Sequence, residues 1–213
     1  MTDKPALSID AAYGLEGAEA ARRLYADWAA TYDDAFAAAY DYVYPAQVAA
    51  LYAGRADRAA PVLDVGAGTG LVGRALRQHG VETVDGLDLS PEMLAVARAR
   101  GGYRDLIEAD LLKPLPFPDG AWGGIVSAGT FTLGHLGPSP LGELARVAAP
   151  GALLVIGVNA RHYRADGFEA AFAALAESGA TTPPDLVETP IYGPASEAPH
   201  AGDRAVAVIL RRL

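Results

Sequence analysis

A cluster of glycines is the first feature of this sequence whose residue types and spacing could do chemistry. Gly66, Gly68 and Gly70 stand at alternate positions in the stretch LDVGAGTGLVG, directly after a short apolar run. Glycine loses more backbone freedom on folding than any other residue, so three glycines within five positions indicate a ligand that approaches the main chain closely. The stretch therefore predicts a ligand-binding loop at the end of a strand.

Three aspartates occupy the ends of three successive expected strands. Asp64 precedes the glycines, Asp88 lies twenty residues after Gly68, and Asp110 lies twenty-two residues after Asp88. A carboxylate at the spacing of Asp88 can accept charge-assisted hydrogen bonds from both hydroxyls of a ribose. Asp110 is placed to accept a hydrogen bond from an adenine amine, although capping its own loop is the alternative role.

The glycine spacing separates two classes of nucleoside ligand. A dinucleotide-binding loop reads GxGxxG, whereas this run reads GxGxG and has leucine at position 71. The loop also carries no lysine or arginine, and an acid-lined site favours a cation over a pyrophosphate. We therefore expect S-adenosylmethionine, with an NAD-dependent oxidoreductase and a non-catalytic binding protein as the alternatives.

The elements that must position these residues alternate between strand and helix patterns from residue 60 onward. The expected strands are Val62–Val65, Thr83–Leu87, Arg104–Glu108, Gly124–Ser127, Ala152–Val158, Val187–Tyr192 and Ala205–Leu210. The expected helices are Leu71–His79, Pro91–Arg100, Leu141–Ala148 and Arg164–Ser178. This alternation predicts an α/β fold, a Rossmann-like three-layer sandwich with a mostly parallel sheet. Ligands in such sheets bind beyond the carboxyl ends of the strands, where the glycines lie.

The first 55 residues differ from the rest of the chain. They have helical patterns and contain nine of the seventeen aromatic residues. Tyr25, Trp28 and Tyr32 share one helix face, which either packs onto the body or turns its polar ends toward the ligand. We expect residues 1–55 to form an N-terminal helical lid segment and residues 56–213 to form the ligand-binding domain.

Composition narrows the function classes. The net charge is −9 and the pI about 4.8, so a nucleic-acid partner is not expected. The chain has no cysteine, and its four histidines lack metal-ligand spacing, so no metal site is predicted. The N-terminus does not read as a signal peptide, and the longest apolar run falls far short of the roughly 20 residues of a membrane span. We therefore expect a cytoplasmic protein that acts on a small molecule and has no membrane partner.

Four stretches taken together resemble the class I S-adenosylmethionine-dependent methyltransferases. They are LDVGAGTGLVG, GLDLSPEML, EADL with LPFPDGAWGGIVSAG, and ELARVAAPGALLVIGV, over about residues 60 to 158. DWAATYDDAF with GTFTLGH is similar to the methyltransferase-like group named after the Williams–Beuren syndrome region. The resemblance implies a seven-stranded sheet whose last strand, in AVAVILRRL, is antiparallel. The sequence differs from the family at one position: Gly123, in DGAWGG, stands where the family often has an acid after DGxF. Whatever structural contact that acid provides is therefore left open.

The resemblance also implies roles for individual residues. The expected cofactor-binding residues are Asp64, Gly66, Gly68 and Gly70 along the methionine arm, Asp88, Leu89 and Met93 at the ribose and nucleoside, Asp110 and Leu111 at the adenine, Ser127 and Ala128 under the sulfur, and Tyr32 at the methionine carboxylate.

Catalysis by such a protein needs alignment and, where the acceptor must lose a proton, a general base. His135, in the loop GTFTLGHL after the fourth expected strand, is the first candidate for that base. His162 is the second candidate, and the alternative for His135 is a role in shaping its loop. The hydroxyl of Tyr32 is a further candidate, for orienting the acceptor.

Overall fold

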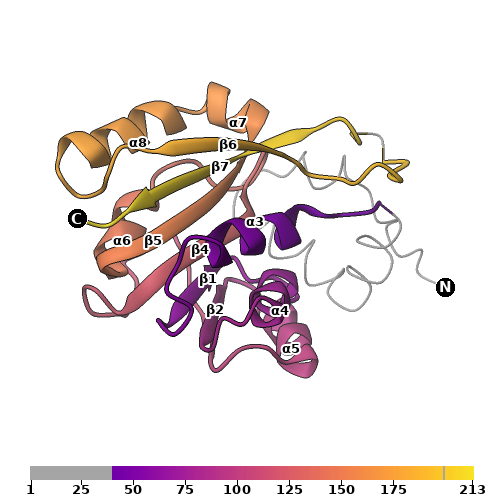
Figure 1. Ribbon diagram of the computed structural model, residues 1–213, viewed down its shortest axis with the longest axis horizontal. Coiled ribbons are helices and arrows are strands. Elements are labelled where there is room, and N and C mark those ends of the chain that lie inside the picture. Colours follow the sequence, from indigo (N-terminus) through magenta and orange to yellow (C-terminus); the bar gives the residue numbers. More distant parts are fainter. Residues whose placement is uncertain (1–39, 199) are drawn as a thin grey trace.

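The computed structural model of the protein describes residues 40–198 and 200–213, and the structural statements below concern these residues (Figure 1). Its strands are β1 (Val62–Val65), β2 (Val84–Asp88), β3 (Leu106–Glu108), β4 (Trp122–Phe131), β5 (Ala148–Asn159), β6 (Asp185–Pro190) and β7 (Arg204–Arg211). Its helices are α3 (Tyr44–Ala53), α4 (Leu71–Gln78), α5 (Pro91–Arg100), α6 (Leu141–Val147), α7 (Ala160–Ala165) and α8 (Phe168–Glu177).

The seven strands form one sheet in the order β3-β2-β1-β4-β5-β7-β6. Strand β7 runs antiparallel to both of its neighbours, and the other pairs are parallel. The predicted α/β class, the strand number and the antiparallel last strand are therefore confirmed. The order reverses between β1 and β4, which opens a ligand crevice at the carboxyl ends of these strands.

Both faces of the sheet are buried, because successive side chains of a strand point to opposite sides. Val62 packs into one hydrophobic core with α3 and α4, whereas Leu63 packs into a second core with α6 and α8. In Figure 1, α3, α4 and α5 lie on one side of the sheet and α7 and α8 lie on the other. This three-layer arrangement leaves the strand ends, not the sheet faces, available to a ligand.

Helix α3 belongs to the core, although its residues fall within the segment expected to form a lid. Val48 is fully buried. The Tyr44 hydroxyl lies against Gly157 and the Tyr52 hydroxyl lies against Gly124, so close that a side chain on either glycine would collide with it. The helix thus lies directly against β4 and β5. Residues 1–39, which carry the rest of the expected lid, are outside the described residues.

Replacing Tyr44 by phenylalanine is expected to stabilise the protein. Burial raises the pKa of the Tyr44 hydroxyl far above its ordinary value, and that oxygen has no hydrogen-bond partner in the described part of the chain. Removing an unpaired buried hydroxyl should raise the free energy of unfolding by about 1 kcal/mol. Thermal denaturation should show a rise of about 2–4 °C in Tm. A fall in Tm would show that the hydroxyl is bonded.

Several elements differ by a few residues from their expected boundaries, and two of the differences change the course of the chain. The helix expected over residues 164–178 is two helices, because Gly167 adopts a left-handed conformation with φ of 76° and breaks the run. The strand expected to end at Ser127 continues to Phe131, with a shift of register against β5 between these two residues. Residues 128–130 therefore bulge from the regular ladder beside the crevice.

The segment that lacks the usual acid is held in another way. A side chain on Gly123 would press on Ala60, with the two Cβ atoms 2.5 Å apart. The neighbouring Trp122 donates its indole N–H to Asp85 over 2.9 Å, and Arg104 donates to the same carboxylate from outside. Because Asp85 is buried in β2, this network ties the start of β4 across the sheet.

The described ranges contain no helix long and apolar enough to cross a membrane. They also contain no group of three or more histidine, aspartate or glutamate side chains arranged to hold a metal ion.

Candidate functional site

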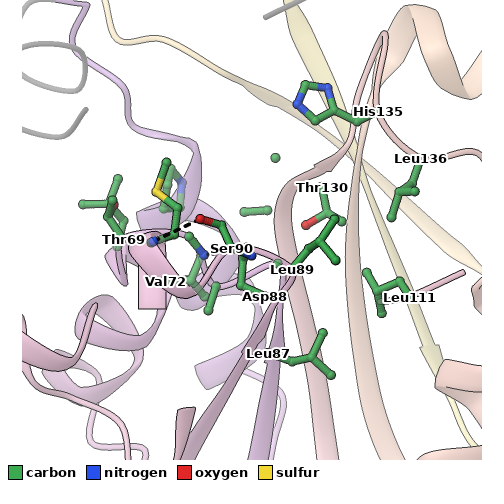
Figure 2. Close-up of a pocket in the computed structure, with 18 of the residues that line it drawn as sticks. Thr69, Val72, Leu87, Asp88, Leu89, Ser90, Leu111, Thr130, His135 and Leu136 are labelled. Atoms are coloured by element: carbon green, nitrogen blue, oxygen red, sulfur yellow. Dashed lines mark hydrogen bonds between the residues drawn. The ribbon is translucent and has the colours of Figure 1, made fainter. Parts of the chain in front are cut away.

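A cavity of about 1130 Å³, including its open mouth, lies at the carboxyl ends of β1, β2 and β4 (Figure 2). It is lined by residues 66–69, 71–72, 87–90, 109–111, 128–130 and 135–136, together with Tyr42, Pro45 and Met93. These residues lie at the ends of β1, β2, β3 and β4 and at the starts of α3, α4 and α5, so the fold brings together residues that are far apart in the sequence.

The glycine loop forms one wall of the cavity. Gly66 and Gly68 line it with left-handed φ angles of 71° and 53°. A side chain on Gly66 would collide with Thr130, whereas a Cβ on Gly68 would meet no atom within 4 Å. Gly68 therefore borders a space that no atom of residues 40–198 or 200–213 fills. Gly70 begins α4 with φ of 96° and does not line the cavity.

Asp88 is held rigidly beside this loop. Its Oδ2 accepts a hydrogen bond from the Gly68 amide over 2.8 Å, and its Oδ1 accepts one from the Ser90 amide over 2.9 Å. Burial raises the pKa of Asp88, and the two amides counteract that rise. A carboxylate can accept about four hydrogen bonds, so both oxygens retain capacity for a ligand.

Asp64 lies beneath the loop rather than in the cavity lining. In β1 it follows Val62 at a spacing of two residues and so points to the same face of the sheet. Its Oδ2 accepts a hydrogen bond from the Tyr103 hydroxyl over 2.6 Å. Burial raises the pKa of Asp64 to about 7, with a further contribution from the nearby Asp88.

Leu89 and Met93, expected beside the nucleoside, and Asp110 and Leu111, expected at the adenine, all line the cavity. The Asp110 carboxylate also serves its own loop, because it accepts a hydrogen bond from the Leu112 amide over 2.9 Å and pairs with the Lys113 ammonium over 3.3 Å. Both roles considered for Asp110 are thus compatible with its position.

The bulge of β4 forms the floor of the cavity. Ala128 lines it, whereas Ser127 is fully buried and donates its hydroxyl to the Val65 carbonyl over 2.8 Å. Thr130 donates to the same carbonyl over 2.9 Å and also lines the cavity. Two hydroxyls therefore fix the backbone just before the glycine loop. Sequence reasoning missed Thr130, because nothing local marks the bulge that turns it inward.

His135 faces the cavity from the loop after β4, across from Thr69 and Ser90 in Figure 2. Its Nδ1 lies 3.0 Å from the Leu133 carbonyl, which requires a proton on Nδ1 and leaves Nε2 as the basic nitrogen. Burial lowers the pKa of His135, so the ring is neutral at pH 7.

His162 does not line the cavity but supports the loop that carries His135. Its Nε2 donates to the Leu136 carbonyl over 2.8 Å, and its ring is buried against Phe168. Tyr32 lies outside the described residues. Another tyrosine from the N-terminal part, Tyr42, lines the cavity and pairs with Tyr192 in a β-bridge; sequence reasoning had not singled it out.

The chemistry available to the cavity follows from its lining. Within the described residues the lining contains carboxylates and one histidine but no lysine or arginine, and most of its side chains are apolar. Such a site suits a nucleoside with a cationic arm better than a phosphate group. It also places a neutral imidazole within the same space.

Known proteins resemble this chain in sequence and in fold. Residues 63–156 match the family model described as a methyltransferase domain. The chain is 43% identical over 101 residues to a demethylmenaquinone methyltransferase from Thermus thermophilus, with 45% of each chain covered. It is 38% identical over 96 residues to the human methyltransferase-like protein 27, covering 45% of this chain and 39% of that protein. The matches thus span less than half the length of these curated relatives.

The structural comparison agrees with the sheet order. The structure of a TehB-like SAM-dependent methyltransferase from Corynebacterium glutamicum superposes with a TM-score of 0.61 at 23% identity, covering 89% of this chain and 98% of that one. The names of the curated relatives specify different acceptors, namely demethylmenaquinone, malonyl-[acyl-carrier protein] and a guanine of 18S rRNA.

Proposed function

We propose that the chain is a class I S-adenosylmethionine-dependent methyltransferase that methylates a small, largely apolar acceptor. Its sheet order and the match of residues 63–156 to a methyltransferase domain support this proposal. The observation that carries the proposal is the Asp88 carboxylate, which two backbone amides hold beside an open glycine.

The residues of the cavity fit S-adenosylmethionine by shape and by charge. Asp88 has the capacity to accept both ribose hydroxyls, and Leu89 and Leu111 offer apolar contacts to the adenine. Gly68 would let the methionine arm lie against bare backbone, because no side chain of the described ranges occupies that space. The carboxylates of the site favour the positive charge of the sulfonium.

When bound, S-adenosylmethionine supplies a methyl group on a positively charged sulfur, which an acceptor removes by in-line attack. The protein's part is to align the acceptor, and correct alignment can contribute roughly 7–11 kcal/mol. His135 is placed to take the acceptor's proton at Nε2, since its Nδ1 is committed to the Leu133 carbonyl. His162 would then act as a positioning residue through Leu136.

A small acceptor is favoured by the lining and by the overall charge. Leu111, Ala128 and Leu136 make much of the cavity apolar, and a net charge of −9 opposes the approach of an RNA backbone. Relatives that act on demethylmenaquinone or malonyl-[acyl-carrier protein] support this class, whereas the 18S rRNA relatives define the competing one.

Calorimetry and an acceptor panel test this function. S-adenosylmethionine and S-adenosylhomocysteine should bind the full chain, and NAD should not. Formation of S-adenosylhomocysteine should then be followed with a hydroquinone, a malonyl thioester and an rRNA fragment as acceptors. Turnover with the first or second supports a small acceptor. Binding of NAD alone would contradict the proposal, and turnover with RNA alone would contradict the acceptor class.

Replacing Gly68 by alanine is expected to weaken S-adenosylmethionine binding by at least about tenfold while the protein stays folded. The new methyl group would occupy the space left open for the ligand, and a left-handed alanine costs about 1–2 kcal/mol of stability. The matched control is Gly179→Ala, since Gly179 is also left-handed with open space at its Cβ but lies outside the cavity lining. Equal affinities for the two variants would contradict the placement of the ligand.

A further inference from the structure

Tyr103 touches both ends of the glycine loop from behind. It lies in the segment between α5 and β3 and does not line the cavity. Its hydroxyl donates to Asp64 Oδ2 over 2.6 Å and accepts a hydrogen bond from the Gly73 amide over 3.1 Å. The Tyr103 side chain thus connects the end of strand β1 to the first turn of helix α4.

Three glycines make room for the Tyr103 ring. A Cβ on Gly70 would lie 3.2 Å from the ring, one on Gly86 would lie 3.0 Å from it, and one on Gly73 would collide with it. These glycines belong to the loop, to β2 and to α4, so the ring fills a socket beneath the loop. Gly73, which no dinucleotide-binding pattern explains, therefore has a packing reason.

The same chain segment holds the loop at a second point. Arg100, at the end of α5, donates to the Thr69 carbonyl over 3.3 Å. The loop is therefore fastened at Asp64, at Thr69 and at Gly73, and two of these three attachments pass through the Tyr103 hydroxyl.

We propose that Tyr103 is a positioning residue for S-adenosylmethionine, whose hydroxyl sets both the shape of the glycine loop and the charge of the Asp64 carboxyl beneath it. This inference rests on the proposed function. Tyr103 has no contact with the ligand space and acts through Asp64 and the loop.

A bound cation would change the ionisation of Asp64. Its neighbours on the adjoining elements are the Tyr103 hydroxyl, the Gly73 amide and the carboxylate of Asp88, and burial raises its pKa to about 7. A cation bound near Asp88 favours ionised Asp64, so binding and deprotonation assist each other. The affinity for S-adenosylmethionine should therefore rise with pH, by up to about tenfold between pH 6 and pH 8. S-adenosylhomocysteine, which lacks the charged sulfur, should show a shallower rise.

Replacing Tyr103 by phenylalanine keeps the ring in its socket and removes the hydroxyl. At pH 8 the affinity for S-adenosylmethionine should fall about tenfold or more, because the bonds to Asp64 and Gly73 are lost. The midpoint of the pH dependence should also move above 7, since ionised Asp64 loses its donor. The control Tyr163→Phe removes a hydroxyl from α7, outside the cavity lining, and should change neither quantity.

A second variant makes the test independent of how well the first one folds. Asp64→Asn cannot ionise at this position, so its affinity should vary less across pH 6 to 8 than that of the wild type. Wild-type affinity and an unchanged midpoint in Tyr103→Phe would overturn the inference and leave the proposed function intact. A pH-independent loss in that variant, or an undiminished pH dependence in Asp64→Asn, would overturn it as well. Failure of the wild-type chain to bind S-adenosylmethionine at any pH would instead contradict the proposed function.

Discussion

Replacing Asp88 by alanine is expected to weaken S-adenosylmethionine binding by about 10²–10⁴-fold. The carboxylate is placed to accept two ribose hydroxyls, and each hydrogen bond to a charged group contributes about 1.5–3 kcal/mol. Two such bonds correspond to the stated range. Isothermal titration calorimetry of the full chain at pH 8 would measure the change directly.

The same substitution also removes the acceptor of the Gly68 and Ser90 amides, so stability must be followed in parallel. Asp185→Ala is the matched control, because it makes the same change of net charge at an exposed position of β6. The control should bind as the wild type does. A folded Asp88→Ala protein with unchanged affinity would remove the basis for placing the ribose at this residue.

Replacing His135 by asparagine is expected to lower kcat by about 10²–10⁴-fold and to leave the affinity for S-adenosylmethionine unchanged. An asparagine amide can occupy the position of Nδ1 and keep the bond to the Leu133 carbonyl, but it has no basic nitrogen at the position of Nε2. The range is the usual contribution of a positioned general base. Initial rates at saturating acceptor would measure it.

The pH profile distinguishes a base from a loop-shaping histidine. Because burial lowers the pKa of His135, the wild-type rate should fall toward acid pH with a midpoint below the ordinary histidine value of about 6.5. In the asparagine variant that acid limb should be absent. His79→Asn, at an exposed position after α4, serves as the control and should keep the wild-type rate and profile. A fully active His135→Asn protein would show that the acceptor needs no base from this residue.

Much of the fold and part of the candidate site followed from local sequence patterns. The short apolar runs, the Ser90–Pro91 helix start and the glycine cluster each depend on neighbours within a few residues, and the structure places the corresponding elements within a few residues of their expected ends. Asp88, Gly66 and Gly68 reach the cavity because the carboxyl ends of parallel strands share one edge of the sheet. The identity of the nucleoside ligand was predicted from this spacing and stays a proposal.

The direction in which each side chain points was harder to foresee. Asp64 was expected to line the ligand arm, but the two-residue period of β1 turns it under α4, beside Val62. That period was readable in the sequence. Ser127 likewise points into the sheet and bonds to Val65, while the bulge turns Thr130 toward the cavity.

The sequence alone therefore determined the order of elements and the edge of the sheet at which Gly66, Gly68 and Asp88 meet. Only the tertiary structure decided that α3 packs into the core, that Trp122 donates a hydrogen bond to Asp85 across the sheet, and that Tyr103 packs among three glycines. The physical reason is separation along the chain. Tyr103 lies 39 residues from Asp64 and 30 from Gly73, and no local periodicity encodes contacts between elements that meet only when the sheet assembles.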